Sequence, residues 1–212
     1  MKNVKYLLLL LAVMFQLPLF SQKVAVDANA VLDKSLASLK SSLPVRMDYD
    51  YVVFDDNDEQ LQRDKGFIYM DNNRYALLMQ DMKVWCDGTT QWSYMREVDE
   101  IYVTDADSDE AQNLSPLYVM EHYREGFSAS AVNQGGVVTV TLQAVDGDTD
   151  VENVQLLILE SDYRLVAMVI SMSGQGGVLV ELDGYVAKCG VGDDVYRCPV
   201  DEFAGCEIID MR

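Results

Sequence analysis

Apolar and polar side chains alternate along most of the chain after residue 44. In VRMDYDYVVF, residues 45–54, the odd positions are apolar or aromatic and three of the even positions carry charges. Such alternation is typical of an antiparallel strand with one buried face. Similar segments follow, and turn-forming runs such as DNN, DG, NQGG and DGDTD separate them. The pattern predicts roughly ten or eleven strands in antiparallel succession.

Two segments have helical spacing instead. In residues 26–42, leucines recur at helical intervals and Asp27 is suited to the N-cap. The segment SPLYVMEHYRE, residues 115–125, begins with a Ser-Pro pair that suits a helix start, and Leu117 and Met120 fall on its apolar side. We therefore expect two helices beside the strands.

A sheet of this width does not stay flat, because the twist between strands accumulates and wide sheets curl. We expect a mainly β fold with some α structure, in which a single antiparallel sheet curls. Its concave face must then be covered by the few helices or hold something else.

The N-terminus has the layout of a secretory signal peptide. A short basic start precedes an apolar run from Tyr6 to Leu17, and a small residue suited to cleavage follows. The run is shorter than the ~20 apolar residues that a membrane-spanning helix needs. We expect residues 1–22 to be removed by cleavage near Ser21-Gln22, and the exported remainder, residues 23–212, to form one domain.

The chain is strongly acidic, with a formal net charge of −19. An acidic surface repels nucleic acids, whose binding requires clustered Lys and Arg, and it is also repelled by an anionic membrane face. High net charge favours solubility, which suits a protein that must display apolar surface. We expect a monomer without a nucleic-acid partner.

Residues typical of catalysis or metal binding are scarce. His122 is the one histidine, and no GxSxG, P-loop or dinucleotide motif is present. The acidic runs that begin at Asp105 and Asp146 lack the Gly and Glu that an EF-hand loop requires at positions six and twelve. We expect no enzymatic activity, no metal site and no cofactor.

The four cysteines, Cys86, Cys189, Cys198 and Cys206, leave the disulfide state open. Export permits disulfides and four cysteines allow three full pairings, but free, partly buried thiols are equally compatible. Cys189 and Cys198 flank GVGDDVYR, which could form a hairpin with a cross-strand bridge. The absence of CxxC spacing disfavours zinc.

The segment WCDGTTQWSY holds both tryptophans. Its Asp-Gly pair is a strong turn signal and predicts a hairpin. A loop of two or four residues places Trp85, Trp92 and Tyr94 on one face, whereas a loop of three residues separates Trp85 from the others. We expect an even loop in which Asp87 forms the turn, Cys86 lies on the opposite face, and the aromatic face is turned toward a cavity or its rim.

The run GFIYMDNNRYALLMQDMKVWCDGTTQWSYMREVDEIYVTD resembles the central segment of LolA-type outer-membrane lipoprotein carriers. In that family a G-x-Φ-x-Φ strand is followed by a P-N-x-F-R-W strand, an SDGKTLWxYD hairpin and a QV strand. SPLYVM resembles the start of the family's later helix, and DVYRCPVDEFAGCEIIDMR its ending of a strand, a Pro-bearing loop and an acidic tail. The matching positions in the central segment are Gly66, Phe67, Tyr69, Tyr75, Leu77, Asp87, Gly88, Thr90, Trp92 and Tyr94.

The resemblance implies an unclosed half β-barrel whose helices form a lid over a hydrophobic cavity. It also implies a periplasmic carrier that shields the acyl chains of lipoproteins during transfer toward the outer membrane. The implied partners are acylated lipoproteins, an inner-membrane release complex and an outer-membrane acceptor. The expected cavity residues have aromatic, Met and Leu side chains, which adapt to apolar ligands: Met47, Tyr49, Tyr51, Phe67, Tyr69, Trp85, Trp92, Tyr94, Leu117 and Met120.

One position departs from the family pattern. The family commonly has a basic residue before the Pro-Asn pair, associated with latching the lid, where this chain reads Met70-Asp71-Asn72. Arg74 comes later in the motif, so we do not assign the lid-latching role of the family's basic residue to Arg74.

Two other functions are weighed against the carrier. A sensor or apolar-ligand-binding domain could use the same half-barrel, although such domains usually accompany a partner-binding module. An exported hydrolase would need clustered catalytic side chains, which the single histidine disfavours.

Overall fold

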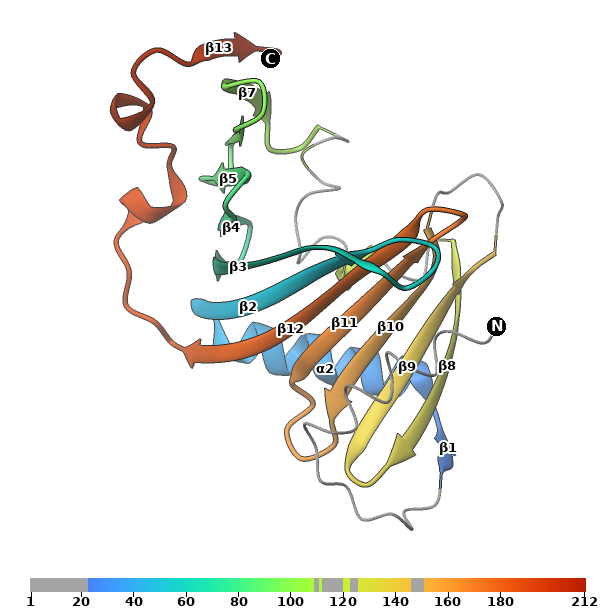
Figure 1. Ribbon diagram of the computed structural model, residues 1–212. Helices are drawn as coiled ribbons and strands as arrows, with labels where there is room; N and C mark the ends of the chain where they lie inside the picture. The colour runs from blue at the N-terminus through green and yellow to red at the C-terminus, as the bar shows by residue number, and fades with distance from the viewer. Residues whose placement is uncertain (1–22, 109–110, 112–119, 123–125, 146–150) are drawn as a thin grey trace. The chain divides into compact units, whose positions relative to one another are not determined.

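The computed structural model describes residues 23–108, 111, 120–122, 126–145 and 151–212. Within these ranges thirteen strands form one sheet, in the order β1-β8-β9-β10-β11-β12-β2-β3-β4-β5-β6-β7-β13 (Figure 1). The strands are β1 (Val24–Val26), β2 (Val45–Phe54), β3 (Gln60–Asp71), β4 (Arg74–Leu78), β5 (Met82–Cys86), β6 (Thr90–Met95), β7 (Glu100–Asp105), β8 (Phe127–Gln134), β9 (Val137–Ala144), β10 (Val151–Leu159), β11 (Leu165–Met172), β12 (Gly176–Ala187) and β13 (Glu207–Asp210). Because β1 and β13 stand at opposite ends of this order, the sheet is not closed. The predicted fold class, mainly β with one unclosed sheet, is confirmed.

The chain divides into two compact units. Unit 1 comprises the described parts of residues 1–38, 51–63 and 124–181, and unit 2 comprises those of residues 39–50, 64–123 and 182–212. Three long strands, β2, β3 and β12, contribute to both units.

The first predicted helix is present as α2 (Ala28–Ser42). Asp27 caps it as expected, since its side chain accepts a hydrogen bond from the Ala30 N–H at 3.2 Å. The buried side chains recur at helical spacing and form one stripe: Ala28, Val31, Leu32, Ser35 and Leu39. An amphipathic helix with this stripe is stabilised by packing rather than by propensity alone.

The second predicted helix lies for the most part outside the described residues. Of its members, Met120, Glu121 and His122 are helical, and Lys40 in α2 forms an ion pair with Glu121 at 2.5 Å. Leu117 is among the residues that the structure does not describe. Within the described ranges, no helix combines the length and the apolar character that crossing a bilayer requires.

The C-terminal segment differs from the sequence prediction in two ways. The run expected to form a hairpin or strand before Cys198 is a 3-10 helix, η1 (Asp193–Tyr196), and a second one, η2 (Val200–Phe203), follows it. The last strand, β13, pairs with β7 in parallel, so the sheet is not wholly antiparallel. The connection from β12 to β13 is long, so no tight turn dictates the direction in which β13 enters the sheet.

Candidate functional site

In unit 1, two rows of apolar side chains cross four neighbouring strands, β9 to β12. Residues opposite each other in antiparallel strands share a face, and so do residues two positions apart along one strand. All eight side chains therefore point to the same side, which we call the ladder face. One row is Val140, Leu156, Met168 and Val180, and the other is Leu142, Val154, Ile170 and Val178.

The ladder face is only partly covered. Val140 and Leu142 are buried, with 0% and 5% of their surface exposed, whereas the other six side chains keep part of their surface in solvent. The opposite side is polar on β9 and β10, at Thr141, Gln143 and Gln155, whereas on β11 and β12 it carries buried apolar residues such as Val169 and Leu179. An apolar face whose side chains stay partly accessible in this way offers contact area to an apolar ligand.

One aromatic residue of β2, Tyr51, lies on the same side of unit 1 as the ladder face. Phe54 and Val52 pack with Val169 and Leu179 on the other face of the strands. Since side chains alternate along a strand, Tyr51 points toward the ladder side. Its hydroxyl accepts a hydrogen bond from the Gln62 side chain at 3.1 Å.

The helix α2 runs across one side of β9 to β12 (Figure 1). Its exposed Lys34 donates a hydrogen bond to the Tyr163 hydroxyl at 3.0 Å and lies 4.7 Å from the centre of that ring. Tyr163 belongs to the turn between β10 and β11. This exposed contact adds little to the packing of the buried stripe of α2, which holds the helix in place.

In unit 2, the predicted hairpin is confirmed. Trp85 pairs with Trp92 and Cys86 with Gln91, which is the four-residue loop. The carboxylate of Asp87 closes the turn, accepting from the Thr89 and Thr90 N–H groups, each at 3.0 Å. Burial alone would raise the pKa of Asp87, but these hydrogen bonds and the nearby Arg197 lower it below its usual value. As expected, Cys86 is buried on the opposite face.

The register places ten side chains on the aromatic face of unit 2. They are Phe67, Tyr69, Ala76, Leu78, Lys83, Trp85, Trp92, Tyr94, Ile101 and Val103. The C-terminal segment packs on this face: Val195, Cys198, Phe203 and Cys206 join its cluster. The Trp85 and Phe203 rings meet edge to face at 5.6 Å, and the Tyr94 and Phe203 rings lie 4.6 Å apart. The chain thus covers much of its own aromatic face.

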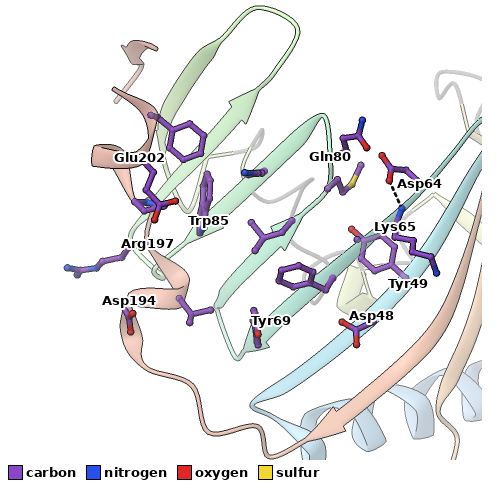
Figure 2. Close-up of a pocket in the computed structure, with 18 of the residues that line it drawn as sticks. Asp48, Tyr49, Asp64, Lys65, Tyr69, Gln80, Trp85, Asp194, Arg197 and Glu202 are labelled. Carbon is purple, nitrogen blue, oxygen red and sulfur yellow. Dashed lines mark hydrogen bonds between the residues drawn. The ribbon is translucent and has the colours of Figure 1, made fainter. Parts of the chain in front are cut away.

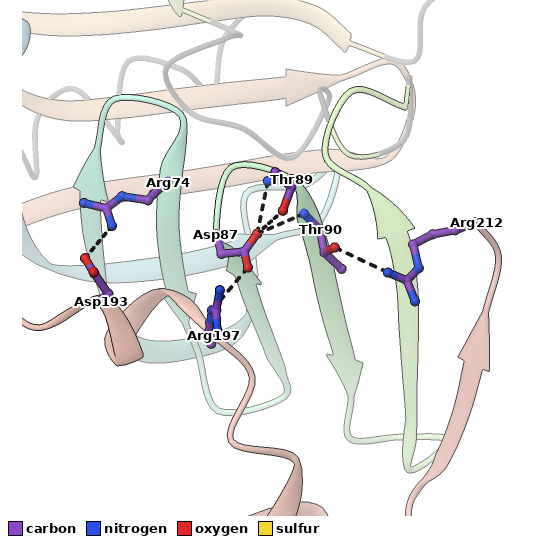
Figure 3. A network of polar contacts seen from close by, with 7 residues as sticks. All are labelled: Arg74, Asp87, Thr89, Thr90, Asp193, Arg197 and Arg212. Atoms are coloured by element: carbon purple, nitrogen blue, oxygen red, sulfur yellow. Dashed lines mark hydrogen bonds and ion pairs between the residues drawn. The ribbon is translucent and has the colours of Figure 1, made fainter.

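Charged side chains hold the C-terminal segment in place (Figure 3). Arg74 bonds Asp71 at 2.5 Å and Asp193 at 2.6 Å, and it stacks 4.7 Å from the centre of the Tyr196 ring. The hydrogen bonds to Asp71 and Asp193 raise the pKa of Arg74. Burial raises the pKa of Tyr196 to about 12. We call Asp71, Arg74, Asp193 and Tyr196 the clasp, and it gives Asp71 a structural role where the family commonly has a basic residue.

A second ion pair fastens the same segment. Arg197 lies 3.2 Å from the Asp87 carboxylate at the hairpin turn, and at the chain end Arg212 reaches the Thr90 hydroxyl at 3.5 Å. The side chain of Arg197 is well exposed, so this contact contributes less than the clasp.

The part of the aromatic face that the C-terminal segment leaves open is a pocket of about 890 Å³, formed within unit 2 (Figure 2). Its apolar lining is Tyr49, Phe67, Tyr69, Leu78, Met79, Trp85, Val195, Pro199 and Phe203. Its charged lining is Asp48, Asp64, Asp183, Asp194, Glu202, Lys65, Lys83 and Arg197. The pocket combines an apolar floor with a charged rim.

The structure brings together four of the ten expected cavity residues. Tyr49, Phe67, Tyr69 and Trp85 all line the pocket. The others are placed elsewhere: Trp92 and Tyr94 pack into the cluster under the C-terminal segment, Met47 and Tyr51 lie on β2, Met120 is helical, and Leu117 falls outside the described ranges. That these ten residues contact a ligand stays a prediction.

The sequence did not single out the ladder face or the charges of the pocket. Met168 and Ile170 do alternate with Ala167 and Val169, but all of these are apolar, so period two does not reveal which pair faces inward. The pocket charges come from β2, β3, β5, β12 and the C-terminal segment, and they meet only in the folded chain.

Among the residues that the structure describes, no group of three or more His, Cys, Asp or Glu side chains is arranged to hold a metal ion. The four cysteines are free thiols, so the bridge considered between Cys189 and Cys198 is not formed. Burial raises the pKa of the Cys198 thiol to about 11, which suppresses its nucleophilic form.

An unclosed, mainly β sheet with one partly covered apolar face is typical of proteins that bind apolar ligands. Residues 17–175 match the family described as outer membrane lipoprotein carrier protein LolA, and the chain belongs to this family. Members of this family are carriers or binding proteins.

Solved structures with the same fold are distant in sequence. An uncharacterized conserved protein from Thermus thermophilus is 10% identical with a TM-score of 0.54, covering 86% of this chain and 98% of its own. A chain of the MucA/MucB complex from Pseudomonas aeruginosa is 12% identical with a TM-score of 0.51, covering 87% of this chain, which spans 64% of that chain. At such identities the likeness is one of fold alone. A comparison with curated proteins finds no match.

Proposed function

We propose that this protein is a periplasmic carrier that shields the acyl chains of lipoproteins on the ladder face of unit 1 during their transfer toward the outer membrane. Membership in the LolA family supports a carrier of this kind. The single observation that carries the assignment to this face is its two rows of partly exposed apolar side chains. Its partners would be acylated lipoproteins, an inner-membrane release complex and an outer-membrane acceptor.

The open face suits a ligand that must be released again. An acyl chain of about fifteen methylenes costs roughly 12 kcal/mol to expose fully, at ~0.8 kcal/mol per CH₂. A face that covers about half of the chain's surface would recover roughly 6 kcal/mol, which corresponds to a Kd on the order of 10⁻⁵ M. Such binding keeps an acyl chain out of water yet allows its transfer to an acceptor.

The side chains of the ladder face also suit an acyl chain. They are aliphatic or Met, without a polar group that a hydrocarbon would leave unsatisfied. Tyr51 points to the same side, so of the ten expected cavity residues it is the one that we place at this site.

The test is binding of a tripalmitoylated cysteine lipopeptide, measured by native mass spectrometry on the purified full chain. Leu156→Asp and Met168→Asp put a charge into the ladder face and are expected to lower lipopeptide occupancy at least tenfold. Gln155→Asp is the matched control, because it lies beside Leu156 on β10 but faces the other way.

Circular dichroism confirms that each variant is folded before binding is compared. Equal occupancy in the control and in both ladder variants would show that acyl chains bind elsewhere, and absence of lipopeptide binding in the wild type would reject the carrier function.

A further inference from the structure

The pocket of unit 2 has a rigid apolar floor. The Phe67 and Tyr69 rings meet edge to face at 5.7 Å, as do those of Trp85 and Phe203 at 5.6 Å, and Trp85 is only 5% exposed. Aromatic side chains held in this way offer contact area without the entropy cost of being ordered by a ligand. The floor is therefore ready to receive apolar side chains.

The cations around this floor are already engaged. Lys65 lies 2.6 Å from Asp50 and 3.6 Å from Asp183, and the hydrogen bond to Asp50 raises its pKa. The Lys83 ammonium lies 5.4 Å from the centre of the Phe203 ring, and Arg197 pairs with Asp87. Lys65 and Arg197 therefore have little capacity left for an anionic ligand.

Two carboxylates at the pocket, unlike these cations, have no partner of opposite charge within the described ranges. Among the residues that the structure describes, Asp194 and Glu202 form neither an ion pair nor a side-chain hydrogen bond, and both are exposed. Figure 2 shows them along the C-terminal segment on one side of Trp85, with Asp64 on the other side. Carboxylates thus stand on both sides of an apolar floor.

From this arrangement we propose that the pocket is a docking site for a basic, apolar-rich peptide segment of a partner protein, in which Lys or Arg alternates with apolar side chains. The apolar side chains pack on the aromatic floor while the cations meet Asp194 and Glu202. The volume of about 890 Å³ accommodates several side chains. The net charge of −19 attracts a basic partner at long range and disfavours a second copy of this chain as the occupant.

The same charges disfavour a membrane surface, because an anionic headgroup would meet the unpaired Asp194 and Glu202, and two of the pocket cations, Lys65 and Arg197, already have carboxylate partners. This docking site lies within unit 2 and is independent of acyl binding on the ladder face of unit 1.

The experiment measures fluorescence anisotropy of a fluorescein-labelled peptide KLKLKLK added to the full chain. The expected result is saturable binding that is at least tenfold weaker for ELELELE and for KSKSKSK, because the first reverses the charges and the second lacks apolar side chains. Replacing both carboxylates, Asp194→Lys and Glu202→Lys together, is expected to weaken KLKLKLK about tenfold. In a Trp92→Phe background, Trp85 is the only tryptophan, and its emission should change when the peptide binds.

The matched control has the same total charge change outside unit 2, with Glu59→Lys and Glu160→Lys together; both residues are exposed and neither lines the pocket. It should weaken KLKLKLK less than twofold. Equal weakening by the control, equal binding of ELELELE, or unchanged Trp85 emission would overturn the proposal.

Two further outcomes separate other ligands from a peptide. Displacement of KLKLKLK by the tripalmitoylated lipopeptide would make the pocket an acyl site, and binding to phosphatidylglycerol vesicles that depends on Asp194 and Glu202 would make it a membrane contact. Either result overturns peptide docking. Failure of the lipopeptide to bind at all would reject the carrier function but leave the peptide result intact.

Discussion

The ladder face of unit 1 and the aromatic face of unit 2 are built in the same way, but they differ in how much of each face another segment of the chain covers. Both are rows of apolar side chains aligned by antiparallel register. In unit 2 the chain's own C-terminal segment lies on the face, and Trp85 keeps only 5% of its surface exposed. In unit 1, six of the eight ladder side chains stay partly exposed. The pattern of apolar residues therefore predicts an apolar face. Whether that face becomes core or a binding surface depends on whether another segment of the chain packs on it.

The side-chain types differ accordingly. The aromatic face relies on directional contacts, with rings meeting edge to face and Lys83 above Phe203. The ladder face has only aliphatic and Met side chains, whose contacts adjust to the ligand. Rigid contacts suit a core or a pre-formed pocket, whereas flexible contacts suit a cargo of variable shape.

The largest expected difference between the two faces is in stability. Trp85→Ala removes a buried ring packed on Phe203 and should lower the free energy of unfolding by about 3–5 kcal/mol. Met168→Ala removes a partly exposed side chain from the ladder face and should cost only about 1 kcal/mol. Urea denaturation followed by circular dichroism measures both, and equal losses would contradict the distinction between core and binding surface.

A smaller effect is expected when the cover of unit 2 is loosened. Arg74→Ala removes the centre of the clasp, with its contacts to Asp71, Asp193 and Tyr196, and should cost about 1–2 kcal/mol after allowance for its partial exposure. Hydrogen exchange should increase mainly in η1 and η2.

The control for this change is Arg96→Ala, because the ion pair of Arg96 with Asp81 is longer, at 3.9 Å, and exposed. It should cost less than about 0.5 kcal/mol. If both variants lose the same stability, the clasp does not hold the segment.

The smallest effect is a dependence of the free energy of unfolding on pH, which comes from Cys198 of the C-terminal segment, packed on the aromatic face. Burial raises the pKa of Cys198 from 9.0 to about 11, so the unfolded chain loses this proton at lower pH than the folded chain. Its contribution to stability is complete below pH 9 and is lost as the pH rises toward 11. At about pH 10 the loss should be about 1 kcal/mol. Denaturation curves at about pH 8 and pH 10 measure it, and Cys198→Ala should remove that part of the loss; an unchanged pH dependence in the variant would refute the assignment.

Local sequence signals predicted the elements that depend on neighbouring residues. The alternation from Val45 to Phe54 gave β2 with the observed bounds, and Asp27 was correctly expected to cap α2. The Asp-Gly turn led to the even loop that pairs Trp85 with Trp92. In each case the determining interactions lie within a few residues of one another.

The remaining features depend on contacts between distant segments. Nothing in GVGDDVYR distinguishes a hairpin from η1, which forms because Tyr196 is buried and Asp193 reaches Arg74. The ladder face could not be predicted from the sequence either, because it depends on the register between strands. Residues 156–159 of β10 are all apolar, so their sequence does not reveal which of them lie on one face, and the register with β11 also shifts between Leu157 and Ile158.

The two outer strands have a consequence for behaviour at high concentration. A sheet that does not close presents backbone donors and acceptors at its ends, where identical chains can add to one another without limit. Here the end strands are short, with three residues in β1 and four in β13, and β13 places Glu207 and Asp210 at that end. The shortness of both end strands and the negative charge of β13 oppose the growth of fibres. A protein that presents an apolar face can thereby accumulate in solution without polymerising.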